Sequence, residues 1–185
     1  MPNRPTLVAV FVVLAAAAVA APVHAQRRMG SQIGPLTFRL TASPQLCLSG
    51  GEWRPGSSVR LNPCGAADSP DAAVIFDNEY SYLKPAANPA LCIMVERGAA
   101  GQALILNPCT TGSDANRSWS FTRRKGLWLR DNSDMCAAPE SQAGGRVLLT
   151  TCRTAPGVWT CQVIPNPPPL DGGYPAARRQ EWCDR

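Results

Sequence analysis

Cysteine is the residue type in this sequence with the most evident chemistry. Eight cysteines are spread over the 185 residues, whereas the single histidine, His24, lies near the N-terminus. Ser-His-Asp and Cys-His catalytic centres and His-ligated metal sites all need an imidazole. An even number of cysteines in an exported protein indicates disulfides, which leave no thiol as a nucleophile or metal ligand. We therefore expect no enzymatic activity, no metal site and no cofactor.

Six of the cysteines belong to a pattern that recurs three times. In each unit an opening cysteine is followed, 16 or 17 residues later, by a closing cysteine at the end of an apolar-x-apolar-x-x segment. Opening cysteines lie 45 and 44 residues apart, and closing cysteines lie 45 and 43 apart. A period of this length indicates one supersecondary unit used repeatedly. The opening cysteines are Cys47, Cys92 and Cys136, and the closing ones are Cys64, Cys109 and Cys152.

The repeat selects among the pairings that eight cysteines allow. Equivalent positions in equivalent units should pair alike, which predicts Cys47–Cys64, Cys92–Cys109 and Cys136–Cys152. In the chain-entropy treatment, each of these bonds contributes on the order of 3 kcal/mol.

Two cysteines, Cys161 and Cys183, remain outside the repeat pairing. We pair them with each other, and the alternative is a bond from Cys183 to another subunit. Cys161 stands at the position that Phe76 and Phe121 occupy in the other units. The third unit thus exchanges a core aromatic residue for an anchor that holds the C-terminal segment, and Trp182 should pack beside this disulfide.

Short segments that alternate apolar and polar residues surround the cysteines and predict half-buried strands. Turns rich in Gly, Pro, Asn and Asp separate them, and no segment keeps a capped 3.6-residue apolar period. This pattern predicts an all-β barrel or sandwich. The segments are Leu36–Leu40, Val59–Leu61, Leu104–Leu106, Trp119–Phe121, Leu127–Leu129 and Val147–Leu149.

The first 25 residues have the pattern of a secretory signal peptide. Arg4 precedes an apolar run over residues 7–21, and Val23-His24-Ala25 provides the small residues of a cleavage site. The alternative, an uncleaved membrane anchor, would need a longer apolar run. We expect cleavage before Gln26, no membrane span afterwards, and a secreted or periplasmic protein.

The two ends of the exported chain differ from its centre. Residues 26–35 are expected to form a polar leader. Residues 165–185 are Pro-rich and are predicted to form an extended tail, because Pro lacks the N–H that a sheet ladder needs. The exported chain carries 17 basic and 13 acidic residues, a net charge of +4 without a basic stripe. Nucleic acid is therefore not an expected partner.

The three units resemble the ricin-type (R-type) lectin β-trefoil family. Leu106-Asn107-Pro108-Cys109, followed by Ala115-Asn116-Arg117-Ser118-Trp119, is similar to the Leu-Trp-Pro-Cys … Ala-Asn-Gln-x-Trp run of that family. The resemblance covers about Leu36 to Val163. It implies a β-trefoil over residues 36–164: three pseudo-symmetric four-strand repeats at about 36–79, 80–124 and 125–164, which build a six-stranded barrel capped by three hairpins.

The resemblance also implies where a sugar would bind. A family site has a carboxylate two residues after the opening cysteine, an aromatic residue two before the closing cysteine, and an Asn-Gln pair before the Trp. No unit of this chain keeps this galactose-type set. The carboxylate positions hold Ser49, Met94 and Ala138, the stacking positions Asn62, Asn107 and Thr150, and the Asn-Gln positions Asp71-Ala72, Asn116-Arg117 and Pro156-Gly157.

If one carbohydrate site remains, we expect it in the second unit, formed by Asn107, Asn116 and Arg117 with Glu96 nearby. Arg117 in place of Gln would favour an acidic sugar or another carboxylate. The alternative is that Asn116 is a turn residue and Arg117 a solvated side chain.

Some aromatic residues also have two interpretations. Trp53, in a predicted hairpin tip, is either an exposed binding anchor or folded back on the core. Tyr80 and Tyr82 should share one strand face. Trp128 either packs on a neighbouring hairpin or is exposed.

Two functions are consistent with these observations. The first is an exported, ricin B-type carbohydrate-binding module with a divergent or degraded sugar site, which binds a glycan or glycoprotein surface. The alternative is a protein-interaction or cell-surface-targeting subunit that has lost sugar binding, like the accessory subunits of cytolethal distending toxins. We place the glycan first, because ligands of the family are so often glycans.

Overall fold

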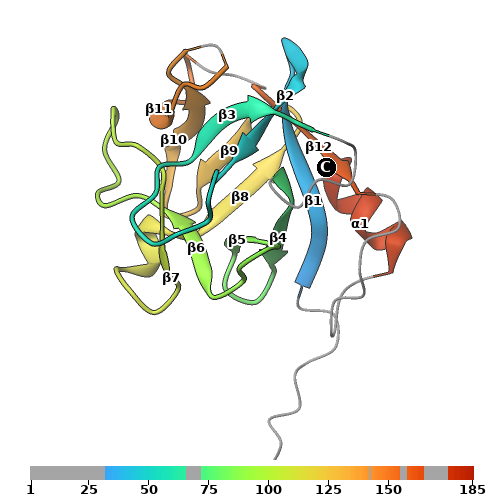
Figure 1. The fold of residues 1–185 in the computed structure, drawn as a ribbon, viewed down its shortest axis with the longest axis horizontal. Helices are drawn as coiled ribbons and strands as arrows, with labels where there is room; N and C mark the ends of the chain where they lie inside the picture. Colours follow the sequence, from blue (N-terminus) through green and yellow to red (C-terminus); the bar gives the residue numbers. More distant parts are fainter. Residues whose placement is uncertain (1–31, 66–71, 142, 155–157, 165–174) are drawn as a thin grey trace, which may run out of the picture.

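The computed structural model describes residues 32–65, 72–141, 143–154, 158–164 and 175–185; the predicted signal peptide lies outside these ranges. The strands of the described chain follow one another in three sets of four (Figure 1). The first set is β1 (Gln32–Leu40), β2 (Ser43–Ser49), β3 (Arg60–Pro63) and β4 (Val74–Asp77). The second is β5 (Tyr82–Pro85), β6 (Leu91–Met94), β7 (Ile105–Pro108) and β8 (Trp119–Thr122). The third is β9 (Gly126–Leu129), β10 (Asn132–Pro139), β11 (Val147–Thr151) and β12 (Trp159–Val163).

The first and last strands of each set form a barrel. β1 pairs antiparallel with both β12 and β4, β4 pairs with β5, and β8 pairs with β9. Tyr82 of β5 forms a bridge to Ser118 beside β8, and β9 contacts β12, so that the six strands enclose the core. Each remaining pair, β2–β3, β6–β7 and β10–β11, is a hairpin.

The three hairpins meet around a pseudo-threefold axis. Val59 N–H donates to the Leu104 carbonyl at 2.8 Å, Leu104 N–H to the Val147 carbonyl at 2.8 Å, and Val147 N–H to the Val59 carbonyl at 2.9 Å. All three side chains are fully buried. Each hairpin therefore satisfies backbone groups of the next, which explains why one unit alone would not be stable.

Two tryptophans occupy equivalent places inside the barrel. The indole N–H of Trp119 donates to the Ile93 carbonyl and that of Trp159 to the Ala137 carbonyl, both at 2.7 Å. Ile93 and Ala137 each follow the opening cysteine of their unit. These indoles thus connect the barrel to the hairpins while burying their aromatic area, with the polar N–H satisfied.

The four disulfides confirm the predicted pairing. Cys47–Cys64, Cys92–Cys109 and Cys136–Cys152 each close one repeat with a Cα–Cα distance of 4.9 Å. The fourth joins Cys161 to Cys183 within the chain, so the alternative of a bond to another subunit is wrong. No cysteine is free.

The predictions for the segments on either side of the expected β-trefoil need correction. β1 begins at Gln32, so residues 32–35 of the predicted leader belong to the barrel. Residues 165–174 of the predicted tail lie outside the described ranges, but Ala176–Cys183 form helix α1 rather than an extended segment. Pro175 immediately precedes this helix, at a position where the missing N–H costs nothing. Eight residues are too few for a stable isolated helix, so tertiary contacts must hold α1.

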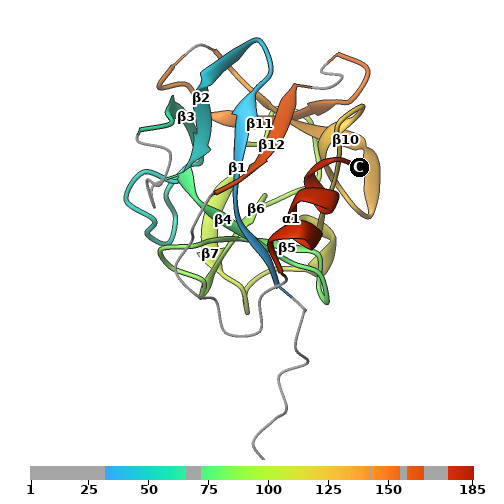
Figure 2. The same ribbon diagram turned by 90° about the vertical axis from the view of Figure 1, so that its right-hand side faces the viewer.

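Helix α1 lies beside β1 and β12 (Figure 2). Its Trp182 packs near the last residues of β4 and β8, at the barrel end away from the hairpins. Trp182 is buried, and its ring centroid lies 4.7 Å from that of Phe76, 5.5 Å from that of Phe121 and 6.3 Å from that of Phe38. Phe76 and Phe121 hold the position that Cys161 holds in the third unit. The expectation that Trp182 packs beside the tail disulfide is therefore confirmed, and its indole replaces the aromatic residue that the third unit lacks.

Trp53 is folded back on the core rather than exposed as an anchor. Its side chain is buried although its backbone has a positive φ of 47°. A Cβ at Gly50 would lie 2.0 Å from its ring, so only glycine fits beneath the indole. In the described ranges, no helix has the length and apolar character that a membrane span requires.

Candidate functional site

Two positions at which the resemblance places a sugar-binding carboxylate hold buried, uncharged side chains. Ser49 ends β2 and Met94 ends β6, and both side chains are buried. Met94 points its methyl group at the loop before β8, since a Cβ at Gly112 would lie 2.7 Å from Met94 Cε. An apolar thioether therefore stands where a carboxylate would accept sugar hydroxyls in the second unit.

The predicted stacking positions are equivalent in space as well as in sequence. Asn62, Asn107 and Thr150 each lie directly opposite the opening cysteine of their unit across the hairpin. All three side chains are half-buried. Among the described residues no hydrogen bond joins Asn107 to Asn116 or Arg117, so a shared site at these three residues stays a prediction. Asp71, Pro156 and Gly157 lie outside the described ranges.

Asn116 has a structural role in the second unit. It ends the short 3-10 helix η2 (Asp114–Asn116), and its side-chain amide donates to the Glu96 carbonyl at 2.8 Å. Its own carbonyl accepts from Val95 N–H at 2.9 Å. Asn116 thus fixes the segment before β8 against the end of β6, in agreement with the alternative that it is a turn residue.

Arg117 is mostly covered and is bonded to its neighbours rather than solvated. Its side chain is only 12% exposed. Nε and Nη2 donate to Asp114 Oδ1 at 3.0 and 2.6 Å, and Nη1 donates to the Thr111 carbonyl at 2.6 Å. The guanidinium also lies 4.9 Å from the centroid of the Tyr82 ring. Arg117 is therefore not the solvated side chain of the alternative interpretation, and two of its nitrogens hold the carboxylate of Asp114.

That carboxylate, Asp114, is the most accessible charged group of the cluster. Its side chain is 68% exposed, yet Oδ1 accepts from Tyr82 Oη at 2.5 Å as well as from Arg117. The hydrogen bonds from Tyr82 and Arg117 lower the pKa of Asp114 below its ordinary value. The pKa of the Tyr82 phenol is raised, mainly because the phenol is partly buried and secondly because it donates a hydrogen bond to Asp114. The result is a rigid, ionised carboxylate with Oδ2 directed to no partner among the described residues.

An exposed aromatic ring is stacked on the tyrosine that donates to this carboxylate. Tyr80 is 53% exposed and is the one exposed large hydrophobic residue of the described chain. It stacks on Tyr82 with ring centroids 5.4 Å apart, as expected from their alternation. Sequence reasoning noted both tyrosines but missed Asp114, which lay in a segment interpreted only as a turn. We call Tyr80, Tyr82, Asp114 and Arg117 the second-repeat cluster.

The cluster has chemistry suited to binding. In the described chain no group of three or more His, Cys, Asp or Glu residues could hold a metal ion. A fixed carboxylate acceptor and an exposed aromatic ring instead match the polar and apolar faces of a neutral pyranose.

The barrel, the three hairpins and the repeat disulfides together define a β-trefoil domain. No protein-family model matches the chain, and the search of curated proteins also gives no match. Among solved structures, the chain matches R-type (ricin B) lectin β-trefoil domains. The agglutinin from Abrus precatorius matches over 62% of this chain with 13% identity and a TM-score of 0.54; the match spans 42% of the agglutinin's own length.

Two further solved structures match over nearly their whole length. The β-trefoil lectin of the Vibrio vulnificus hemolysin/cytolysin, with N-acetyl-D-lactosamine bound, matches over 72% of this chain and 95% of its own, with 19% identity and a TM-score of 0.54. The C-half of the earthworm R-type lectin, in complex with GalNAc, matches over 70% and 98%, with 10% identity and a TM-score of 0.53. At these identities the likeness establishes the fold.

Proposed function

We propose that this chain is an exported, non-enzymatic carbohydrate-binding module whose sugar site is the second-repeat cluster. The observation that carries the proposal is the exposed Asp114 carboxylate, held by Tyr82 and Arg117 beside the exposed ring of Tyr80. Such a carboxylate accepts hydrogen bonds from two hydroxyls of one sugar, and the aromatic ring packs on the C–H face. The likeness to lectins with N-acetyl-D-lactosamine and GalNAc supports a glycan ligand.

The cluster favours a neutral sugar over an acidic one. Asp114 presents negative charge at the surface, whereas the guanidinium of Arg117 is mostly covered and already engaged. A carboxylate on the ligand would be repelled by Asp114 without a free cation of the cluster to compensate. This replaces the expectation of an acidic ligand at Arg117.

The test is a glycan array with the disulfide-bonded protein, residues 26–185, followed by titration of the best neutral glycan. We expect Asp114→Asn to weaken binding roughly tenfold or more, because hydrogen bonds to a charged group contribute more than neutral ones. Asp131→Asn removes an equally exposed carboxylate outside the cluster and should leave the affinity unchanged. Equal affinity of wild type and Asp114→Asn would exclude this site.

Binding should be nearly independent of pH over the physiological range. The lowered pKa of Asp114 keeps its carboxylate ionised as the pH falls through the ordinary carboxyl range, and the raised pKa of Tyr82 keeps its phenol protonated in base. We expect one affinity from about pH 5 to about pH 9, with loss only in stronger acid, where Asp114 protonates. Calorimetric titration at several pH values measures this. A fall in affinity already between about pH 6 and pH 5 would show that another group controls binding.

One observation favours a second function, a protein-interaction module. The family positions Ser49 and Met94 are buried and contribute no acidic group. Folded protein that binds nothing on a broad glycan array would support this second function, and the partner would then be sought by pull-down.

A further inference from the structure

The barrel end closed by α1 carries a second hollow, distinct from the second-repeat cluster. This hollow, which we call the barrel-end pocket, has a volume of about 420 Å³, within the range of roughly 300–1,000 Å³ typical of small-ligand sites. Its walls come from the β4–β5 turn, strands β8 and β9 with the residue after β9, and α1 with the residues after it. It is lined by Phe76, Asn78, Ser81, Ser120, Phe121, Thr122, Trp128, Arg130, Trp182 and Arg185.

The side chains that line the barrel-end pocket include two arginines and no Asp or Glu. Arg130 is positioned by a hydrogen bond from Nη1 to Ser81 Oγ at 2.9 Å. The side chain of Arg185 has no ion-pair partner among the described residues. Since no acidic side chain lines the pocket beside the two guanidinium groups, the pocket favours an anion.

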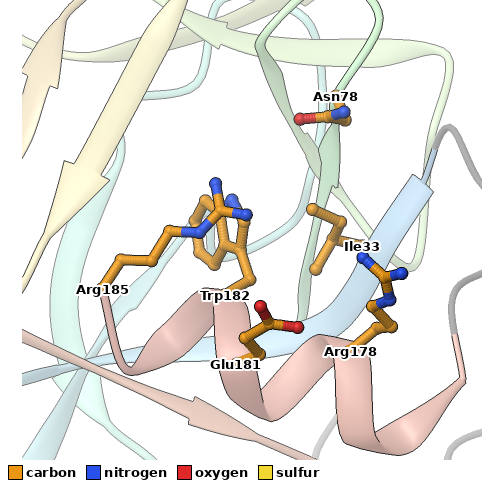
Figure 3. Close-up of a pocket in the computed structure, with 6 residues that line it drawn as sticks. All are labelled: Ile33, Asn78, Arg178, Glu181, Trp182 and Arg185. Atoms are coloured by element: carbon orange, nitrogen blue, oxygen red, sulfur yellow. The ribbon is translucent and has the colours of Figure 1, made fainter.

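The nearest carboxylates are already occupied or face elsewhere. Asp77 Oδ2 pairs with Lys84 Nζ at 2.6 Å, and Asp184 pairs with Arg123. Glu181 lines a smaller cavity of about 50 Å³ next to the pocket, together with Arg178 and Arg185 (Figure 3). Arg178 faces that cavity as well, so the charge on this side of α1 also stays positive.

The remaining lining residues suit a hydroxylated ligand. Buried Trp182 and Phe121 contribute aromatic surface, and half-buried Trp128 forms a wall, with Lys125 Nζ 4.8 Å from the centroid of its ring. Hydroxyls of Ser120 and Thr122 and the amide of Asn78 add neutral hydrogen-bonding groups. A polar anion without hydroxyls would leave these groups and the aromatic wall unused.

The backbone of the barrel-end pocket is strained at Ser81, the residue that positions Arg130. Ser81 has a φ of 62°, a left-handed conformation that is uncommon for a residue other than glycine. Its carbonyl accepts from the backbone N–H of Trp119 at 2.7 Å, and its hydroxyl accepts from Arg130 Nη1. Such strain persists only where the surroundings over-determine it, as in ligand sites.

We propose that the barrel-end pocket binds an acidic sugar, with Arg130 and Arg185 holding the carboxylate and Trp128 packing against the ring. Arginine forms paired hydrogen bonds to a carboxylate, which gives both affinity and orientation. The pocket exists on one side of the barrel because α1 contributes Trp182 and Arg185 there, with no counterpart in the pseudo-symmetric repeats. The site does not depend on the proposed glycan site at Asp114.

The probe is glucuronic acid, titrated into the ¹⁵N-labelled protein while the indole and backbone signals of Trp128 are followed by NMR. Glucose and inorganic phosphate serve as the neutral and the non-sugar titrants. We expect saturable shifts with glucuronic acid, at least tenfold weaker binding of glucose and phosphate, and at least tenfold weaker binding of glucuronic acid by the Arg130→Gln/Arg185→Gln variant. Arg97→Gln, which removes an exposed arginine outside both cavities, should bind like wild type.

The two proposals fail separately in this experiment. Asp114→Asn should bind glucuronic acid as wild type does, because Asp114 does not line the barrel-end pocket. The proposal is overturned if glucuronic acid gives no saturable shift, if glucose or phosphate binds equally well, or if the double variant keeps wild-type affinity. Both arginines are exposed, so the variants should fold, which thermal unfolding verifies.

Discussion

Replacing Trp182 with alanine is expected to lower the free energy of unfolding by about 3–5 kcal/mol, the usual cost of removing a buried tryptophan. The reason is the position of the indole, which is 4% exposed and lies between Phe38, Phe76 and Phe121. Its loss leaves a cavity at the end of the barrel and removes the main apolar contact of α1. Urea unfolding followed by circular dichroism measures the change.

Trp128→Ala is the matched control for this prediction. Trp128 is half-buried on β9, so its removal opens less internal space. We expect it to lower the free energy of unfolding by no more than about 1 kcal/mol, the size of a typical non-core substitution. If Trp182→Ala costs no more than Trp128→Ala, then α1 does not form part of the core.

Removal of the Cys161–Cys183 bond is expected to have an effect of similar size. A 22-residue separation corresponds to about 3 kcal/mol in chain-entropy terms, and the range for native disulfides of small secreted domains is about 2–5 kcal/mol. The variant is Cys161→Ala/Cys183→Ala. Because α1 is too short to be stable alone, it should also detach more often, which exposes Arg179, buried in the intact fold, to trypsin.

The variant Cys136→Ala/Cys152→Ala separates the loss of stability from the detachment of α1. It opens a loop of 16 residues within the third repeat and should cost a similar free energy of unfolding, about 3 kcal/mol. It leaves α1 attached, so cleavage after Arg178 and Arg179 under native conditions should stay as slow as in wild type. Equal protection in both variants would mean that Trp182 alone is enough to hold the helix.

The fold could be predicted in its main features because cysteine spacing is recorded directly in the sequence. Three units of equal period cannot each bury an apolar face alone, so they must combine, and equivalent cysteines then pair alike. The pairing of Cys92 with Cys109 follows from this reasoning, whereas Cys161 and Cys183 were paired because they remained; the structure confirms both. The hairpin strands around Leu104 and Val147 could be predicted from a second local pattern, because alternation of apolar and polar residues marks a half-buried strand.

The same local signals were insufficient at the ends of the barrel. Gln32–Pro35 carry little periodicity, and they become strand because β4 offers backbone partners. Helix α1 has eight residues, too few to give a helical period, and it exists because a disulfide and Trp182 attach it to the barrel. In both segments a long-range contact decides the local conformation.

The candidate sites depended on tertiary structure still more strongly. The resemblance to R-type lectins implied that Met94 and Asn107 stand where that family has the carboxylate and the aromatic residue of a galactose-type site. It did not indicate that Arg117 would hold Asp114, because their shared partner Tyr82 lies 32 residues before Asp114. Nor did it bring Arg130 and Arg185 to one pocket, since that requires α1 to lie across the barrel end. Disulfides and strands follow patterns repeated along the chain, whereas a binding site forms where distant segments meet, and only packing decides which segments do.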